Sequence, residues 1–307
     1  MNKVHVIVNP YSARGQTEKK WGSIQSAIKA HFREFKYVFT EKPRQATEIA
    51  RSLIRDGFDL IIGVGGDGTL NEISNGFFGE TSGKTINQDA ALGIIPSGTG
   101  SDFIRFMKIP REFEKSAAMI KNSKNKKIDI GKITYGGAGA REQYFINVAD
   151  FGLGAEVIKR IANVQSVQRG ALTYYRGLLA TLMNYRSKTV TLTVDGQQQL
   201  RGEYLIGAIA NGRIFGGGMI IAPQAEPNDG FFDLVLIGDM KKLEIIRNTR
   251  LLYTGTIAKN PKVVILKARN IKVESQEDVF TEYDGEMGEK LPAEFSIVAR
   301  ALNFRIG

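Results

Sequence analysis

Two patterns of apolar residues divide the chain into two parts. In the first 120 residues, short apolar runs typical of buried strands alternate with stretches in which apolar residues recur at the helical spacings of three and four. The strand-like runs lie at residues 4–8, 35–39, 60–64 and 91–95, and the helix-like stretches at 17–30 and 46–54. This alternation predicts an α/β domain built on a doubly wound parallel sheet.

From about residue 128 the pattern becomes that of a mainly β protein. Apolar and alternating runs, separated by Gly, Asn and Asp turns, lie at 144–148, 190–194, 204–210, 232–237, 263–266 and 271–273. Helix-like stretches at 172–185 and 241–253 interrupt them. We therefore predict domains at 1–127 and 128–293, the second of them β-sandwich-like, with 294–307 as a candidate segment for return to the first.

Four polar or glycine-rich segments follow the predicted strands of the first domain. They are NPYSARG from Asn9, TEKP from Thr40, GGDGT from Gly65 and PSGTGSD from Pro96. In a parallel sheet these loops meet at the carboxyl ends of the strands, where ligands bind. We expect the binding site of this domain at that edge.

The run GVGGDGTLNE, at residues 63–72, has the composition of a phosphate-binding loop. Gly65, Gly66 and Gly68 let the main chain approach a ligand closely. Thr69 and Glu72 have capping-box spacing, which predicts a helix that begins there and points its positive end at the same place. The alternative is a tight strand-to-helix turn with an ordinary cap.

Asp67 is the unusual member of this run. A carboxylate repels phosphate unless a cation lies between them, as Mg²⁺ does between Asp and nucleotide phosphates. The loop therefore favours a metal-bound nucleotide over phosphate alone.

Composition narrows the chemistry further. The chain has 307 residues, 42% of them apolar, which suits two folded domains, and it contains no Cys. Both His5 and His31 lie in segments that predict structural roles, so acid and base chemistry falls to carboxylates. The N-terminus has no signal-peptide pattern and no apolar run reaches the length of a membrane span, so we expect a cytoplasmic protein.

The net charge of +10 is compatible with nucleic acid, anionic lipid or nucleotide as partner. The densest basic cluster, Lys121, Lys124, Lys126 and Lys127, is interpreted as a solvated linker. No RNA-binding motif or zinc-finger spacing is present, so we expect no nucleic acid. A basic surface favours transient contact with an anionic membrane. The sequence leaves a homodimer open.

Three generic motifs are near matches only. GETSGKT at 79–85 is one residue short of a P-loop and follows a helix. The GxGxxG spacing at Gly63 follows the third predicted strand, without an acidic residue at the end of the next one. Ser101 and Asp102 lack the GxSxG context of a hydrolase.

Taken together, the motifs resemble the diacylglycerol kinase catalytic family, bacterial soluble lipid kinases whose nucleotide fold is shared with sphingosine kinases, NAD kinases and phosphofructokinases. GGDGTLNE at 65–72 is common to this superfamily. The lipid kinase branch is indicated by NPYSARG at 9–15, GIIPSGTGSDFIR at 93–105, NGRIFGGGMIIAPQAEPNDGFFDLVLI at 211–237 and YDGE at 283–286. The resemblance covers nearly the whole chain.

The resemblance implies roles for matching positions. Its nucleotide contacts fall on Asn9, Thr40, Gly65, Gly66, Asp67, Gly68, Thr69, Leu70, Asn71 and Thr99. Ser97 and Ser101 stand where the family usually has Leu and Asn, which leaves the role of Asp102 open between a metal ligand and a helix-terminal acid.

A structural Mg²⁺ is also implied, held by the side chain of Asp229 and the carbonyls of Glu226 and Phe231. The alternative for this segment is a plain Asp-Gly turn that leads into a strand.

The implied reaction is phosphoryl transfer from ATP to a lipid hydroxyl. Asp67 and Asp102 would hold catalytic Mg²⁺, and Glu286 would accept the hydroxyl proton, with the acceptor between the two domains. Diacylglycerol, giving phosphatidic acid, is the first candidate acceptor. A sphingoid base, another glycerolipid, NAD, or a nucleotide-binding regulator without catalysis are the alternatives.

Overall fold

The computed structural model describes residues 3–79, 84–98, 101–136, 141–162, 181–182 and 184–307. The chain forms two compact units. Unit 1 contains residues 1–130 and 299–307, and unit 2 contains residues 131–298. The chain leaves unit 1 within strand β5 (Asn125–Tyr135) and returns within strand β17 (Ala293–Arg305).

Unit 1 is built on a parallel sheet with the order β2-β1-β3-β4. Its strands are β1 (Val4–Val8), β2 (Lys36–Phe39), β3 (Leu60–Gly65) and β4 (Ala91–Pro96). The last residues of β17 add a fifth parallel strand beside β4. The four strand predictions for this part of the chain are confirmed. Every residue of β1, β3 and β4 is buried, which explains why these segments are mostly apolar, whereas no residue of β2 is fully buried.

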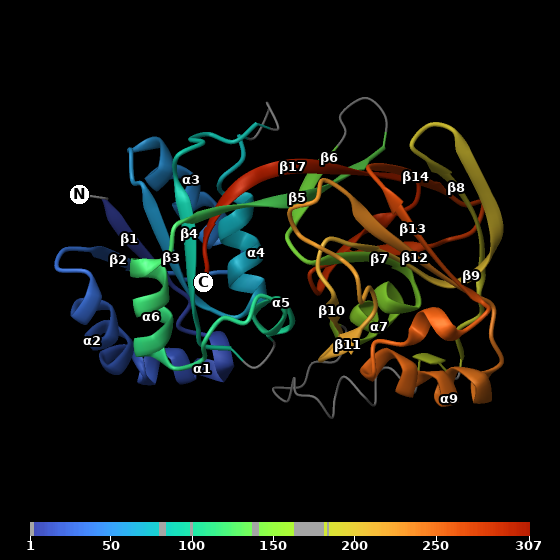
Figure 1. The fold of residues 1–307 in the computed structure, drawn as a ribbon, viewed down its shortest axis with the longest axis horizontal. Helices are drawn as coiled ribbons and strands as arrows, with labels where there is room; N and C mark the ends of the chain where they lie inside the picture. Colours follow the sequence, from blue (N-terminus) through green and yellow to red (C-terminus); the bar gives the residue numbers. More distant parts are fainter. Residues whose placement is uncertain (1–2, 80–83, 99–100, 137–140, 163–180, 183) are drawn as a thin grey trace. The chain divides into compact units, whose positions relative to one another are not determined.

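Helices cover both faces of this sheet (Figure 1). Val6 and Val8 pack with Ile24 of α2 (Trp21–His31) and Ile120 of α6 (Phe113–Asn122). The other face carries α3 (Gln45–Arg55) and α4 (Asp67–Asn75), and Gly63 leaves room there for Ile73. The doubly wound α/β prediction is therefore confirmed.

The predicted helix at 17–30 is two helices. Helix α1 (Ser12–Lys19) ends at Lys20, and α2 begins at Trp21. Three successive residues near the start of α1 have positive φ, Ala13 at 51°, Arg14 at 60° and Gly15 at 79°. Because these residues have left-handed backbone, the first turn of α1 is irregular, and regular helix begins after Gly15.

Unit 2 is mainly antiparallel β, as predicted. Its strands besides β5 and β17 are β6 (Arg141–Phe145), β7 (Val148–Gly152), β8 (Lys188–Val194), β9 (Gln198–Ala210), β10 (Ile214–Phe215), β11 (Met219–Ile220), β12 (Phe232–Gly238), β13 (Val263–Ala268), β14 (Asn270–Glu274), β15 (Phe280–Tyr283) and β16 (Glu286–Lys290). Its helices with bounds among the described residues are α7 (Leu153–Ala162), α9 (Lys242–Tyr253) and the short η1 (Ile257–Lys259).

Strand β9 organises the core of unit 2. Its first half pairs with β8, and its second half pairs with both β7 and β12. Phe145 and Phe232 stack at 5.6 Å between ring centroids in the buried cluster that these strands enclose. The burial of alternate residues along β8 explains why its period of two was readable in the sequence.

Two expectations for this region change, and a third is tested only in part. The apolar run 144–148 is two strands, because the chain turns at Ile146 and Asn147 between β6 and β7. Most of the lysine cluster is not a linker, since Lys121 lies in the last turn of α6, and Lys126 and Lys127 lie within β5. The expected helix at 241–253 is α9, whereas most of the one at 172–185 lies outside the described residues.

Candidate functional site

The loops of unit 1 meet at the carboxyl edge of its sheet, as expected for parallel strands. Backbone bonds continue the ladder beyond the strands into these loops. They run from Asn9 N–H to the Val64 carbonyl at 3.0 Å, from Thr40 N–H to Val8 at 2.9 Å and from Ser97 N–H to Gly65 at 2.8 Å. The start of each predicted ligand loop is thus tied to the end of a neighbouring strand.

Asn9 links the first loop to the glycine-rich loop. Its Nδ2 donates to the Thr69 hydroxyl at 3.0 Å, while its Oδ1 accepts from the N–H of Tyr11 at 3.0 Å. Thr69 and Thr40 are both buried. These side chains therefore fix the loops against each other.

Gly65 and Gly68 differ in what surrounds them. A Cβ at Gly65 would lie 2.6 Å from Cβ of Thr69, so packing inside the unit requires glycine there. A Cβ at Gly68 would meet nothing within 4 Å. Glycine within a helix lowers stability by about 1 kcal/mol relative to alanine. Packing inside the unit therefore gives no reason for glycine at position 68, and the open space there is free for a ligand.

The predicted capping box is wrong. Helix α4 begins at Asp67, with Gly66 as its N-cap and no side-chain cap. Thr69 is instead bonded to Asn9, and Glu72 Oε2 accepts from the N–H of Ala46 in α3 at 3.2 Å. Burial raises the pKa of the Glu72 carboxyl. The positive end of α4 therefore lies directly at Gly66 and Asp67, where anion binding is favoured.

Asp67 and Asp102 belong to one cluster. Asp67 Oδ2 accepts the backbone N–H of Asp102 at 2.7 Å, so the first residues of α4 and α5 (Asp102–Phe106) are joined directly. Ser101 is the N-cap of α5 but makes no side-chain cap bond. The Asp102 carboxylate lies 3.9 Å from the Arg105 guanidinium and is 13% exposed. Asp102 is thus a helix-terminal acid and, through its backbone, the partner of Asp67.

The donor set at this cluster fits Mg²⁺. The Asp67 and Asp102 carboxylates, on the first residues of α4 and α5, are the kind of hard oxygen ligand that Mg²⁺ prefers.

Ser97 has a partner that the sequence did not reveal. Its hydroxyl lies 2.6 Å from the hydroxyl of Thr17, which also donates to the Ser97 carbonyl at 2.9 Å. Both residues are buried, so the loop after β4 is anchored to α1. The predicted nucleotide contact Thr99 lies outside the described residues, whereas the buried Leu70 and Asn71 lie within α4.

In unit 2, Glu286 begins strand β16 directly after a tight hairpin turn. Asp284 and Gly285 have φ of 49° and 86°, the left-handed pair that a two-residue hairpin needs. Tyr283 pairs with Glu286 across the turn. The Glu286 side chain is exposed.

Asp284 anchors this hairpin. Its carboxylate accepts the N–H groups of Ile146 at 2.8 Å, Asn147 at 3.0 Å and Val148 at 3.2 Å. These bonds also stabilise the corner between β6 and β7, which explains why the predicted strand at 144–148 is broken.

A pair of buried acids that the sequence reading missed lies below the hairpin. Asp150 of β7 is directly opposite Glu282 of β15 in the sheet register, and both are almost fully buried. Glu282 Oε2 accepts the N–H of Gly285 at 3.0 Å, and Asp150 Oδ1 accepts the N–H of Ala155 at 3.1 Å. Burial raises the pKa of both carboxyls, and the neighbouring Asp150 raises that of Glu282 further. The only available signal was a single acid between apolar or aromatic residues in each segment, in VADFG at 148–152 and in FTEY at 280–283.

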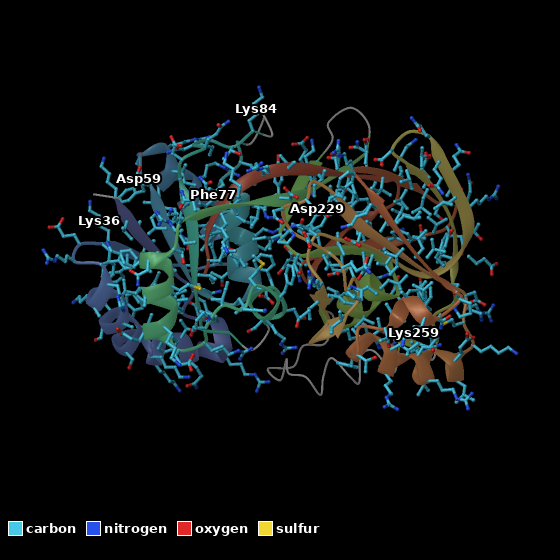
Figure 2. The ribbon with its side chains drawn as sticks, in the orientation of Figure 1. Lys36, Asp59, Phe77, Lys84, Asp229 and Lys259 are labelled. Carbon is cyan, nitrogen blue, oxygen red and sulfur yellow. The ribbon has the colours of Figure 1, made fainter. Side chains whose placement is uncertain are left out.

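A lysine of strand β13 contacts the predicted metal loop at Asp229, which is labelled in Figure 2. Asp229 Oδ1 accepts the N–H of Phe231 at 3.0 Å, and its Oδ2 lies 2.7 Å from the ammonium of Lys267. The same ammonium lies 2.7 Å from Asp233, whose carboxyl has a pKa raised by burial. So arranged, Asp229 and its neighbours do not fit Mg²⁺, and the metal role of Glu226, Asp229 and Phe231 stays a prediction.

The histidines lie away from these groups. His5 is buried in β1 with its ring 5.1 Å from that of Phe58, and burial lowers its pKa. His31 Nε2 lies 2.8 Å from Glu114.

Among the residues that the structure describes, there is no cluster of three or more His, Asp or Glu side chains suited to a metal. The described residues also contain no helix long and apolar enough to cross a membrane.

Comparison with known proteins covers both units. The family model described as the diacylglycerol kinase catalytic domain matches residues 3–133. The model described as the YegS C-terminal NAD kinase beta sandwich-like domain matches residues 147–305. The chain is 31% identical to a diacylglycerol kinase of Bacillus subtilis (strain 168) over 96% of its length and 93% of the relative. It is 29% identical to a diacylglycerol kinase of Staphylococcus aureus (strain MRSA252), over 98% of this chain and 91% of that one.

Solved structures have the same fold. A crystal structure of a diacylglycerol kinase from Bacillus anthracis str. Sterne superposes with a TM-score of 0.72 at 21% identity, covering all of this chain and 97% of that one. Yeast NADH kinase complexed with NADH gives a TM-score of 0.53 at 11% identity, covering 99% and 82%. Such identities speak for the fold alone, which is the predicted α/β domain followed by a mainly β domain.

Proposed function

Because this chain belongs to the diacylglycerol kinase family, we propose that it transfers the γ-phosphate of ATP to the free hydroxyl of diacylglycerol, giving phosphatidic acid. Membership makes it a lipid kinase, a phosphotransferase with an alcohol group as acceptor, as the motifs predicted. The proposal adds the phosphoryl donor, the acceptor and the residues that act on them.

The observation that carries the proposal is the bond from Asp102 N–H to Asp67 Oδ2 at 2.7 Å. It joins the Asp67 carboxylate, at the positive end of α4, to the backbone N–H of Asp102, 35 positions later in the chain. Open space beside Gly68 lies at the same place. Phosphate groups of ATP would bind the N–H groups of this turn, and Asp67 and Asp102 would hold the accompanying Mg²⁺.

When bound, Mg²⁺ would neutralise negative charge on the phosphates. The protein's own contribution is to position the donor, since phosphoryl transfer depends mainly on alignment and charge stabilisation. The bonds from Asn9 to Thr69 and from Ser97 to Thr17 support this role, because they hold the loops around the phosphate turn in one arrangement.

Glu286 would act as the general base. Its ionised carboxylate accepts the proton of the lipid hydroxyl as the oxygen bonds to the γ-phosphorus and the bond to the ADP oxygen breaks. Exposure of Glu286 on the anchored hairpin supports the assignment, because a base must reach a substrate that comes from outside the unit.

The test uses the purified protein with labelled ATP and a panel of acceptors. The panel comprises diacylglycerol, monoacylglycerol, a sphingoid base and NAD. We expect phosphate transfer to diacylglycerol, and the variants Asp67→Asn and Glu286→Gln should each lose roughly a hundredfold or more of kcat. The matched control is Glu289→Gln, an exposed acid on the same strand as Glu286.

Two results would overturn the proposal in different ways. Transfer to NAD or a sphingoid base, without transfer to diacylglycerol, would replace the acceptor. Binding of ATP without transfer to any acceptor would favour a catalytically silent regulator.

A further inference from the structure

Helix α9 of unit 2 has an exposed apolar stripe. None of its residues is fully buried, and Leu243, Ile246 and Tyr253 are 66%, 56% and 40% exposed. Their spacings of three and seven place them on one face of the helix. They are three of the six exposed large hydrophobic residues among those that the structure describes, so exposed apolar surface is concentrated here.

The opposite face of α9 packs the helix against the core of unit 2. Ile245, Leu251 and Leu252 pack against the buried cluster formed by β9, β12 and their neighbours. The stripe is therefore not the core-facing side of the helix, and its exposure does not come from a loosely attached element.

Basic residues surround the stripe. Arg247 and Arg250 lie on the same face by their spacing, and further exposed basic residues flank it at the start of α9 and beyond its end. The flanking ones are Lys241, Lys242, Lys259 and Lys262. Figure 2 places Lys259 beside α9, where other nitrogen-tipped side chains extend outward.

Two acids lie nearby, and they leave the surface basic. Glu244 is paired with Lys262 at 2.8 Å, and Asp239 lies before the helix. A groove of about 520 Å³ runs between α9 and the segment after η1, with Lys241, Arg247 and Lys259 in its lining. Such a groove offers several cations to an anionic headgroup.

We propose that α9 docks this protein on an anionic phospholipid bilayer, with Leu243, Ile246 and Tyr253 entering the interface and the basic residues contacting headgroups. This rests on the proposed function, in which the acceptor is a membrane lipid. An amphipathic helix with apolar and basic residues on its exposed side is suited to lie in the plane of a bilayer. A second copy of the chain would oppose like charges, and nucleic acid gives no reason for exposed Leu and Ile.

Charge alone would have selected a different surface. The lysine cluster at Lys121, Lys124, Lys126 and Lys127 has none of the six exposed large hydrophobic residues beside it in the sequence. Electrostatic attraction without apolar insertion is readily screened by salt, so the two surfaces can be distinguished by experiment.

The experiment measures pelleting of the full chain with vesicles of phosphatidylcholine alone or with 30% phosphatidylglycerol. The apolar variant combines Leu243→Gln with Ile246→Gln, the basic variant combines Arg247→Gln with Arg250→Gln, and the control combines Lys124→Gln with Lys127→Gln. We expect the parent and control to bind the anionic vesicles, and each α9 variant to bind about tenfold or more weakly. Binding by the apolar variant should also become more sensitive to salt.

A second measurement separates docking from chemistry. Activity is compared on a short-chain diacylglycerol dispersed in solution and on a long-chain one in anionic vesicles. Both α9 variants should keep parental activity on the short-chain lipid and lose about tenfold on the vesicles. If neither lipid is phosphorylated by any protein while the α9 variants still lose vesicle binding, docking holds and the proposed acceptor fails.

Three results would overturn the docking proposal. The first is unchanged vesicle binding by both α9 variants, and the second is loss of binding in the Lys124 and Lys127 control instead. The third is a parent dimer, seen by analytical ultracentrifugation, that the α9 substitutions dissociate, because the stripe would then be covered by a second copy.

Discussion

At the scale of single residues, side chains that the motif predicts to bind ligand also make hydrogen bonds within the protein. Asp67 stabilises the start of α5 through its bond to Asp102 N–H, and Thr69 accepts from Asn9 instead of capping its own helix. Gly65 and Gly68 look alike in the sequence, but only Gly65 has a neighbour that excludes a side chain. The motif therefore contains one glycine that packing requires, Gly65, and another, Gly68, that leaves open space.

The two glycines give opposite predictions. Gly65→Ala should destabilise unit 1 by about 1–3 kcal/mol, because its Cβ would overlap Thr69. Gly68→Ala should leave thermal stability equal or raise it by up to about 1 kcal/mol, since alanine favours helix. The same methyl group would enter the open space, so KM for ATP should rise roughly tenfold. Thermal unfolding and ATP kinetics measure both effects, and an unchanged KM in Gly68→Ala would contradict phosphate binding at this turn.

At the scale of elements, ionisable side chains lie between the turns and strands of unit 2. Lys267 of β13 links Asp229, in the turn before β12, to Asp233 in β12 itself. Asp150 and Glu282 face each other between β7 and β15. Each arrangement places charge where it affects stability, and each gives a measurable response to metal or pH.

The turn before β12 should not need a metal. With Lys267 present, EDTA should leave the melting temperature of the parent unchanged. Lys267→Met should lower stability by about 1–2 kcal/mol, less than for a fully buried pair because Lys267 is 40% exposed, and should make the melting temperature rise with added Mg²⁺. A parent that melts earlier in EDTA would instead support the Mg²⁺ site implied by the resemblance.

The buried acids predict a pH response. Their pKa values are raised in the fold, that of Asp150 from 3.8 to about 7, so the folded state keeps protons that the unfolded chain has released. Stability from this pair is complete below the unfolded pKa and is lost as pH rises through the folded one, by at most about 1.4 kcal/mol per pH unit and proton. Asp150→Asn keeps a neutral acceptor for Ala155.

Thermal unfolding followed by circular dichroism from pH 5 to pH 8 checks this response. The parent should lose more stability over that range than Asp150→Asn. Parallel curves for the two proteins would show that Asp150 does not carry an elevated pKa.

At the scale of the whole molecule, the last residues of the sequence complete the parallel sheet of unit 1. The last residues of β17 pair with β4, and Phe304 is fully buried with its ring 5.9 Å from that of Phe103. Asn303 Nδ2 donates to the Gln88 carbonyl at 2.7 Å. Unit 1 therefore includes residues 299–307, which lie within the segment 294–307 named from the sequence as a candidate for return to the first domain.

Phe304→Ala should destabilise unit 1 by about 3–5 kcal/mol through loss of buried contacts and the cavity left behind. Urea unfolding followed by the fluorescence of Trp21, the only tryptophan, reports on this unit. Glu294→Ala, at an exposed position of the same strand, is the control. An unchanged Trp21 transition in Phe304→Ala would mean that β17 contributes little to unit 1.

Local pattern determined much of what was predicted. The buried strands of unit 1, helices α3 and α9, and the β character of unit 2 follow from apolar periodicity, which each segment carries within itself. The capping-box prediction failed because the Thr69 hydroxyl is bonded to the side chain of Asn9, 60 positions away, instead of capping its own helix. The break at 146–147 likewise depends on Asp284, which is far away in the chain.

By itself, then, the sequence determined the strands of unit 1, the positions of the loops that follow them and, through its motifs, the family. Only the tertiary structure decided which side chains meet. Asp67 and Asn9 find their partners 35 and 60 positions away, and Asp229 pairs with Lys267 at a separation of 38. The physical reason is that burial periodicity is encoded locally, whereas hydrogen bonds and ion pairs between distant residues exist only once the chain has folded.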